Sequence, residues 1–202
     1  MKNKIYLVLI TALLLIVTNS CGVYETLENF ARVKFKVDSY NNFRLADVSL
    51  ADKKDIKDFT AMEYVRLTGA FVKGELPFSF LVNIEAKNPN DGTGGFPATD
   101  LSIQSFPFRV IIEDKEVLTG NIDEAFIVPG VGENKIIPIS VQFDVLKFFK
   151  DKSFEDVANL ILAIGGKNGS ESKITIKAQP VIGTPVGNIK YPNEITIDHD
   201  FN

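Results

Sequence analysis

The sequence predicts an all-β fold, an antiparallel β-sandwich with one or two short helices. Apolar and polar residues alternate with a period of two over most of the chain, which is typical of strands that bury one face. Turn-forming residues separate these segments, and seven or more short strands between turns favour a sandwich. Only two segments follow the 3.6-residue period of a helix.

The first twenty-one residues are typical of a bacterial export and lipidation signal. Lys2 and Lys4 precede an apolar segment at 5–17, and a small serine stands directly before Cys21, the only cysteine of the chain. A basic start, an apolar stretch and a small residue before the cleavage point mark a secretory signal peptide. We therefore predict a signal peptide at 1–20 and a lipid on Cys21, which becomes the first residue of the mature protein.

A permanent transmembrane helix is not expected, because the apolar segment is about thirteen residues long and a transmembrane helix needs about twenty. A secreted protein with an incidental cysteine remains an alternative, because Thr18 stands where a lipoprotein signal usually has leucine. We favour lipidation, since a lone cysteine directly after the apolar segment is otherwise hard to explain. The acyl chains alone would hold the protein on a membrane. Gly22 stands where inner-membrane lipoproteins carry a retaining aspartate, so we expect the periplasmic side of the outer membrane of a bacterial cell envelope.

The rest of the chain is expected to form one domain. Residues 21–32 are predicted to be a lipidated tether, and 33–202 a single domain that is large enough to fold without disulfides. Loss of the signal removes two of the 22 basic side chains and leaves 26 acidic ones, a formal charge of −6. No basic run or stripe is present, so we expect no nucleic-acid partner.

The elements begin with a strand through 33–37, and a further strand is indicated through Leu45 and Val48. A helix follows, because Thr60 and Glu63 have the spacing of a capping box and the apolar residues after them recur every 3.6 positions up to a glycine. Such a stripe could dock a partner or a membrane. We favour a helix that closes an open end of the sandwich, since a stripe on a short helix usually faces the core.

The next strand is the most regular of the chain. Apolar residues occupy every second position of 76–87, so one face of that strand is expected to be buried. The alternation then changes phase within 101–112, near Ser105 and Pro107, which indicates a bulge or bend. The elements expected after it are a turn at 114–115, a strand through Val117, a turn at 129–134, a strand at 135–143, a helix at 153–164 and strands at 173–178 and 194–198.

The middle of the chain resembles a known family. An apolar strand runs into Asn88-Pro89-Asn90, and the segment 106–113, Gly120, Ile-Val-Pro-Gly at 127–130 and the strand 136–141 follow in order. This arrangement resembles the water-stress and hypersensitive-response domain of the type 2 late embryogenesis abundant (LEA) family, which also occurs among bacterial lipoproteins. The resemblance is clearest over 76–143 and extends more weakly over 174–197. It implies an immunoglobulin/fibronectin type III-like sandwich and a non-enzymatic protein that protects against desiccation and other stresses.

The Asn-Pro-Asn motif also has a direct physical interpretation. Pro89 removes a backbone donor and favours an extended conformation at Asn88, so the motif is expected to end a strand. Asn90 and Asp91 could begin a calcium loop. The segment 90–95 lacks the alternating acidic ligands of an EF-hand, and we favour a hairpin loop there.

Candidate catalytic residues are few. The only histidine, His199, stands between two aspartates near the C-terminus, where a strand would point it away from both of them. The carboxylate pairs Asp114 with Glu116 and Asp123 with Glu124 could in principle serve acid–base chemistry. Acidic residues at turns need no catalytic role, so we predict no catalytic residue, no metal site and no cofactor.

Two functions therefore remain open for a lipid-anchored envelope protein that is not an enzyme. The first is protection during desiccation or other stress, as the resemblance implies. The second is an interaction module that binds an envelope protein or glycan through an edge strand or through the loop 90–95.

Overall fold

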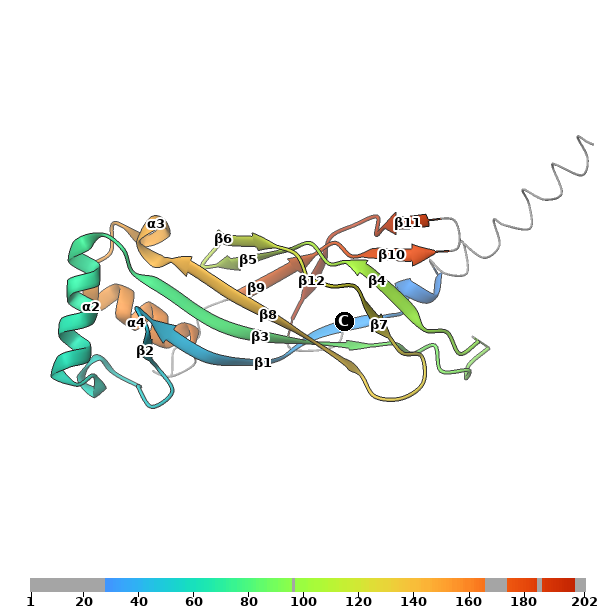
Figure 1. Ribbon diagram of the computed structural model, residues 1–202, viewed down its shortest axis with the longest axis horizontal. Coiled ribbons are helices and arrows are strands. Elements are labelled where there is room, and N and C mark those ends of the chain that lie inside the picture. Colours follow the sequence, from blue (N-terminus) through green and yellow to red (C-terminus); the bar gives the residue numbers. More distant parts are fainter. Residues whose placement is uncertain (1–27, 96, 166–173, 185–186, 199–202) are drawn as a thin grey trace, which may run out of the picture.

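One long sheet packs against two shorter sheets in this computed structural model, which describes residues 28–95, 97–165, 174–184 and 187–198 (Figure 1). Each sheet has four strands, and every strand pair is antiparallel. Apolar side chains from all three sheets and from the helices form one hydrophobic core. The predicted all-β sandwich is therefore confirmed.

The strand orders define the two layers. The long sheet has the order β2 (Val48–Ser49), β1 (Lys34–Leu45), β3 (Pro77–Lys87) and β8 (Lys135–Asp144). The second sheet has the order β11 (Gly187–Lys190), β10 (Val181–Thr184), β4 (Leu101–Ser105) and β7 (Phe126–Val128). The third has the order β12 (Ile195–Ile197), β9 (Ile174–Ala178), β5 (Phe108–Ile112) and β6 (Lys115–Gly120).

The two most regular strands of the sequence form the centre of the long sheet. In β3 every second side chain from Phe78 to Ala86 is buried, and β8 buries every second side chain from Ile137 to Phe143. Their register places Phe80 opposite Val141, so the apolar faces of both strands point into the core. Burial of such side chains contributes about 1.5–3 kcal/mol each. The period-two predictions for both strands are confirmed.

The phase change predicted near Ser105 and Pro107 is the boundary between the two shorter sheets. Before it, β4 pairs with β10; after it, β5 pairs with β9. The opposite segment breaks at Pro180, and the Gln179 amide bridges the two breaks by donating to the Pro107 carbonyl at 2.9 Å. A proline in each segment removes a ladder donor. The layer therefore bends at this level in both segments.

One strand prediction is wrong. Leu45 and Val48 do not share a strand, because Leu45 ends β1, Val48 begins β2 and the two residues pair across a tight turn. The turn residues Ala46 and Asp47 have φ of 43° and 65°, which is the geometry of a two-residue hairpin turn. Neither residue is a glycine, and a lone aspartate after an alanine is a weak turn signal. The β5–β6 turn, predicted at 114–115, lies one residue earlier. It is formed by Glu113 and Asp114, which also have positive φ without a glycine.

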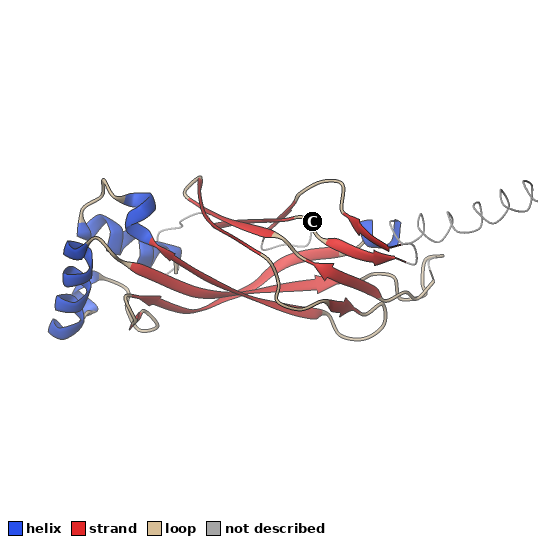
Figure 2. Ribbon diagram, turned by 45° about the horizontal axis from the view of Figure 1, so that its top comes forward, coloured by secondary structure: helices blue, strands red, loops and turns tan. Residues whose placement is uncertain are grey.

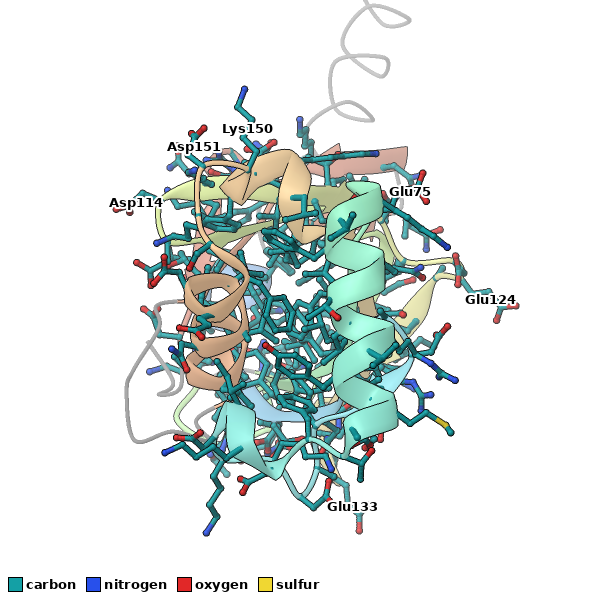
Figure 3. The ribbon with its side chains drawn as sticks, turned by 90° about the vertical axis from the view of Figure 1, so that its left-hand side faces the viewer. Glu75, Asp114, Glu124, Glu133, Lys150 and Asp151 are labelled. Atoms are coloured by element: carbon teal, nitrogen blue, oxygen red, sulfur yellow. The ribbon has the colours of Figure 1, made fainter. Side chains whose placement is uncertain are left out.

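Both predicted helices are present, and they lie at one end of the sandwich (Figure 2). Helix α2 (Ala61–Lys73) and helix α4 (Phe154–Ile164) begin with the expected type of capping box, and α2 ends at Gly74 in the left-handed conformation. Phe154 of α4 packs edge-on against Tyr64 and Phe71 of α2. Viewed from that end, the helices lie across the apolar core (Figure 3).

Several short elements were not predicted. They are the strands β7 and β10, the 3-10 helix η1 (Ile56–Asp58) and the helix α3 (Val145–Phe149). Each has five residues or fewer, which is too short for a period to be recognised. The strand predicted at 173–178 is β9, although Lys173 lies outside the described residues.

The folded domain begins earlier than the sequence predicted. Residues 28–31 are helical, and within the segment assigned to the tether Asn29 and Phe30 are buried. The Phe30 ring packs edge-on against Tyr191, with the ring centroids 4.9 Å apart. The predicted signal peptide at 1–20 and Cys21 lie outside the described residues. Among the residues that are described, no helix is both long enough and apolar enough to span a membrane.

Tyr40 provides a spectroscopic test of the packing. Burial, together with the charge of Asp198, raises the pKa of the Tyr40 phenol from 10.0 to about 12. In the unfolded chain this phenol ionises near pH 10. The free energy of unfolding is therefore unaffected by its ionisation below pH 10, and it falls as the pH rises from 10 to about 12. We expect Tyr40→Phe to remove that alkaline loss, and Asp198→Asn to lower the pKa of Tyr40. Tyrosinate absorbance and denaturant unfolding at pH 9–12 would detect both effects. A Tyr40 that ionises near pH 10 would contradict this packing.

Candidate functional site

The Asn88-Pro89-Asn90 motif lies directly after β3, as predicted, and forms a buried junction. Asn88 is 8% exposed and Asn90 is completely buried. Among the described residues, no buried side-chain nitrogen or oxygen lacks a hydrogen-bond partner. Because a buried amide is costly unless its groups are bonded, the partners of these two asparagines determine what the motif does.

The side-chain amide of Asn88 connects three segments of backbone. Its Nδ2 donates to the Thr99 carbonyl at 2.8 Å and to the Val128 carbonyl at 3.1 Å. Its Oδ1 accepts from the backbone and side-chain amides of Asn90 at 3.1 and 2.7 Å. Asn88 therefore ties the end of β3 to the residues before β4 and to the last residue of β7.

Asn90 extends the junction to the N-terminal segment. Its Nδ2 donates to the Asn29 carbonyl at 2.7 Å, and its Oδ1 accepts from Nη1 of Arg32 at 2.8 Å. The backbone carbonyl of Asn90 accepts from the Thr99 amide at 3.1 Å. The motif thus holds residues 29–32 against the sheet, which the sequence pattern alone did not indicate.

The loop after the motif has no built cation site. Oδ1 of Asp91 accepts from the backbone amide and hydroxyl of Thr93 at 2.9 and 2.6 Å, and these bonds lower the pKa of the Asp91 carboxyl. Asn90, the other candidate calcium ligand, is turned inward. Within the described part of the chain, no three acidic, histidine or cysteine side chains are grouped so that they could hold a metal ion. His199 lies outside the described residues.

The first carboxylate pair considered for catalysis is divided between a turn and an ion cluster. Asp114 lies in the β5–β6 turn, whereas Glu116 of β6 accepts from Nη1 of Arg109 at 3.0 Å. Arg109 also makes a bidentate pair with Glu194, at 2.7 and 2.6 Å. These bonds raise the pKa of Arg109 and lower that of Glu194. The cluster joins β5 to β6 and to the residue before β12, which is a structural role.

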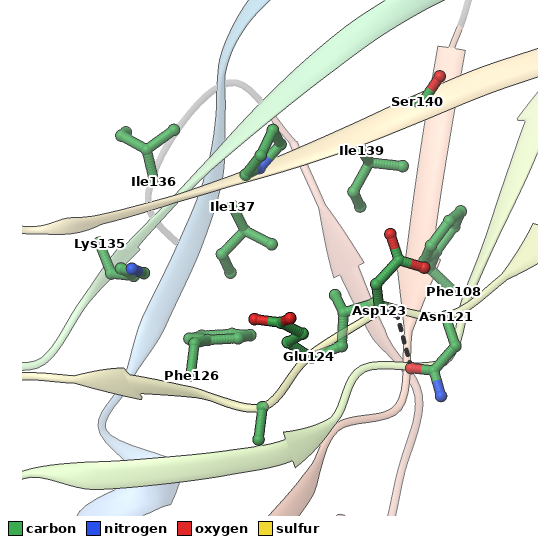
Figure 4. A pocket seen from close by; sticks show the side chains of 13 residues that line it. Phe108, Asn121, Asp123, Glu124, Phe126, Lys135, Ile136, Ile137, Ile139 and Ser140 are labelled. Atoms are coloured by element: carbon green, nitrogen blue, oxygen red, sulfur yellow. Dashed lines mark hydrogen bonds between the residues drawn. The ribbon is translucent and has the colours of Figure 1, made fainter.

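The second carboxylate pair borders a cleft of about 640 Å³ (Figure 4). Asp123 and Glu124 belong to the segment 121–126, which forms one wall, and β8 residues 135–140 form the other. Phe108 contributes to the lining from β5. The cleft therefore lies beside β8, between the long sheet and the opposite layer.

Asn121 holds the acidic wall in place. Its Oδ1 accepts from the backbone amide of Phe106 at 2.7 Å and from that of Ile122 at 2.9 Å, and its Nδ2 donates to the Ser105 hydroxyl at 2.8 Å. Gly120, just before it, lies under the Phe108 ring, where an added Cβ would be 2.6 Å from Cζ. The two residues therefore fix both the acidic wall and the aromatic part of the lining.

Helix α2 presents a second surface, of apolar character, to solvent. Met62, Val65 and Val72 are 79%, 69% and 85% exposed, and Gly69 falls on the same face. These four positions are spaced 3, 4 and 3 residues apart, the pattern by which one helix packs on another. Arg66 and Lys73 flank this row at equivalent positions. We call these four residues the α2 apolar face.

Gly69 gives a simple stability test of that face. An alanine Cβ at this position would meet nothing within 4 Å, and glycine inside a helix costs about 1 kcal/mol relative to alanine. We expect Gly69→Ala to raise the free energy of unfolding by up to about 1 kcal/mol. Denaturant unfolding followed by circular dichroism measures this gain. A destabilised variant would show that the face is covered within the folded chain.

Comparison with known proteins finds fold neighbours and no family. No family model matches the chain, and no curated protein matches it. A crystal structure of a protein from Archaeoglobus fulgidus is 11% identical, with a TM-score of 0.31, and covers 60% of this chain and 84% of its own. A solution structure provisionally described as a late embryogenesis abundant protein is 13% identical, with a TM-score of 0.37 and coverages of 98% and 92%.

A second solution structure, of an Arabidopsis thaliana protein, is 17% identical, with a TM-score of 0.33 and coverages of 82% for both chains. At these identities and TM-scores the similarities assign no function to this chain. The β-sandwich is instead established by the chain's own strand order and register.

Proposed function

We propose that this chain is a lipid-anchored, non-catalytic protein of the bacterial cell envelope, whose LEA type 2-like domain protects against desiccation and related stress. The observation that carries the proposal is the Asn88-Pro89-Asn90 junction. The motif that carries the sequence resemblance is buried and internally bonded, so it acts in folding. Members of a family without a catalytic site can share such a motif because the motif is needed for folding.

The position of the N-terminal segment supports the anchor. Residues 28–31 lie at the end of the sandwich opposite the helices α2 and α4 (Figure 1). A lipid on Cys21 would hold the domain by that end and direct the helices away from the membrane. The anchor would place the protein at the periplasmic side of the outer membrane, the location that Gly22 favours.

The anchor is tested by the intact mass of protein extracted from bacterial membranes. We expect a mature chain that begins at Cys21 and carries acyl groups, and a Cys21→Ala variant that lacks the acyl mass and leaves the membrane fraction. An unmodified chain in the soluble fraction, with Cys21 present, would overturn the anchor.

Protection is tested separately, with the domain from residue 22 onward. A desiccation-sensitive enzyme is dried and rehydrated with this domain, or with an equal mass of serum albumin, and its remaining activity is measured. We expect more activity to survive with the domain. Recovery no better than with albumin, from a domain shown by circular dichroism to be folded, would contradict the protective function.

An interaction module is the second candidate, and the α2 apolar face favours it. Exposed apolar rows of this kind often mark contact surfaces, and Arg66 and Lys73 beside it would suit an envelope partner that carries carboxylates. The test is cross-linking in intact cells with wild-type protein and with a Val65→Glu, Val72→Glu variant. We expect a reproducible product that the variant loses, and identical product patterns would exclude the face as the contact.

A further inference from the structure

The cleft beside β8 has an apolar floor. Figure 4 shows Phe108 and Phe126 on one side of it and Ile137 and Ile139 of β8 on the other. Ile122 also belongs to the lining. Ile137 and Ile139 also belong to the hydrophobic core, so the floor is continuous with the interior. Ile136 lies at the rim and is 43% exposed. Phe108, Ile137 and Ile139 are only 3–8% exposed. An alkyl or aryl group in the cleft would therefore exchange water for apolar contacts mainly at Ile136 and at the half-buried Ile122 and Phe126.

The rim of the cleft carries negative charge. Asp123 and Glu124 are both exposed; the Asp123 carboxylate is directed toward β8 in Figure 4, whereas that of Glu124 lies nearer Phe126 and projects outward in Figure 3. Within the described chain, no lysine or arginine forms an ion pair with either carboxylate. Lys135 is the only cation in the lining. Since the chain as a whole has a formal charge of −4, local and overall charge both favour a positively charged ligand.

The shape of the wall opposes a bound peptide strand. β8 is the outer strand of the long sheet, so an extended peptide could in principle pair with its free edge. Pro138 stands in the middle of the 135–140 wall and has no amide hydrogen, and proline together with lysine on an edge strand blocks strand addition. The wall therefore favours a compact ligand that uses the apolar floor and the acidic rim.

We propose that this cleft binds a compact amphipathic cation, in which an alkyl or aryl group rests on the isoleucine and phenylalanine lining and an ammonium group lies at the acidic rim that Asp123 and Glu124 form. The inference is independent of the lipid anchor and of protection against drying. Neither test of the proposed function alters the cleft, and the variants below leave Cys21 unchanged.

The test compares two probes of equal chain length and opposite charge. Hexylammonium and hexanoate are titrated into the isotopically labelled domain, and the NMR signals of the isoleucine methyl groups are followed. We expect hexylammonium to shift the signals of Ile137 and Ile139 with saturation, and to bind at least tenfold more tightly than hexanoate. Equal affinities, or no saturable shift at these residues, would overturn the proposal.

Charge variants locate the ammonium. Asp123→Asn with Glu124→Gln should weaken hexylammonium binding at least tenfold and leave the affinity for hexanoate no lower than before. The matched control is Glu75→Gln with Asp151→Asn, which removes two exposed carboxylates outside the cleft. The control should bind hexylammonium as the wild type does. Equal weakening by both double variants would indicate a general surface-charge effect and overturn the assigned site.

A third variant tests the floor. In Gly120→Ala the new Cβ would lie 2.6 Å from Cζ of Phe108, so the ring must move and reshape the lining. We expect weaker binding of hexylammonium while its preference over hexanoate is kept, because the acidic rim is unchanged. Unchanged affinity in a folded Gly120→Ala domain whose Phe108 signals have shifted would show that the floor does not contact the ligand.

Discussion

Replacing Asn90 with alanine is expected to lower the free energy of unfolding by about 2–4 kcal/mol. The substitution removes the donor to the Asn29 carbonyl and to Oδ1 of Asn88, both at 2.7 Å, and the acceptor for Arg32 at 2.8 Å. Asn90 is completely buried. A buried polar group that loses its partner costs about 1–3 kcal/mol, and this substitution affects more than one such group.

The measurement is denaturant unfolding followed by far-ultraviolet circular dichroism. Asn134→Ala is a suitable control, because Asn134 is exposed and its side chain donates to the half-buried Glu85 rather than joining two distant segments of backbone. We expect the control to change stability by less than about 1 kcal/mol. A loss below about 1 kcal/mol for Asn90→Ala would mean that the junction does not hold the N-terminal segment to the sheet.

The Asn90→Asp variant tests whether the amide donor itself is needed, because it keeps the side-chain volume while it removes the donor and adds a charge. The aspartate keeps the volume of the side chain and an oxygen for Arg32, but it replaces the amide donor with a second acceptor that faces the Asn29 carbonyl and Oδ1 of Asn88. We therefore expect it to be no more stable than Asn90→Ala. A stable Asn90→Asp variant would show that the contact with Arg32 outweighs the two donated bonds.

The sequence predicted the regular parts of this fold because their periods are long enough to recognise. Strand β3 alternates over eleven residues, and α2 combines a capping box with a terminal glycine. Leu45 and Val48 were assigned to one strand because no glycine or asparagine marks a turn between them. Asp47 tolerates the left-handed conformation, but Ala46 rarely adopts it. When the surrounding hairpin imposes a backbone conformation on a residue such as Ala46, the residue type does not predict that conformation.

The candidate sites were predictable to different degrees. The Asn88-Pro89-Asn90 motif was recognised as the end of a strand, but its link to Arg32 joins residues 58 positions apart in the chain. Similarly, Asp123 and Glu124 were noted as a carboxylate pair. That they border the same cleft as β8 depends on how the two layers pack. Contacts of this kind follow from the tertiary arrangement, which a local pattern does not contain.

Replacing Gly130 with alanine is expected to cost about 3 kcal/mol or more, because the space at this position is occupied by backbone. An added Cβ would lie 2.6 Å from the Thr99 carbonyl oxygen and 2.9 Å from the Thr99 nitrogen, and closer still to the carbonyl oxygen of Asn90. The Gly130 amide also donates to Asp100 at 2.9 Å, so the glycine is held in place. Overpacking against flexible side chains typically costs 1–3 kcal/mol, and these backbone atoms have less freedom to move.

Two other glycines separate this steric effect from backbone conformation. Gly94 has φ of +66° with open space around its added Cβ, so Gly94→Ala should cost only the left-handed strain of about 1–2 kcal/mol. Gly69→Ala should be stabilising. If Gly130→Ala is destabilised no more than Gly94→Ala, the Asn-Pro-Asn segment does not pack against the β7–β8 turn as described. If the segment does pack there, the Gly130→Ala, Asn90→Ala double variant should lose less stability than the sum of the two single losses, because both substitutions disrupt the same junction.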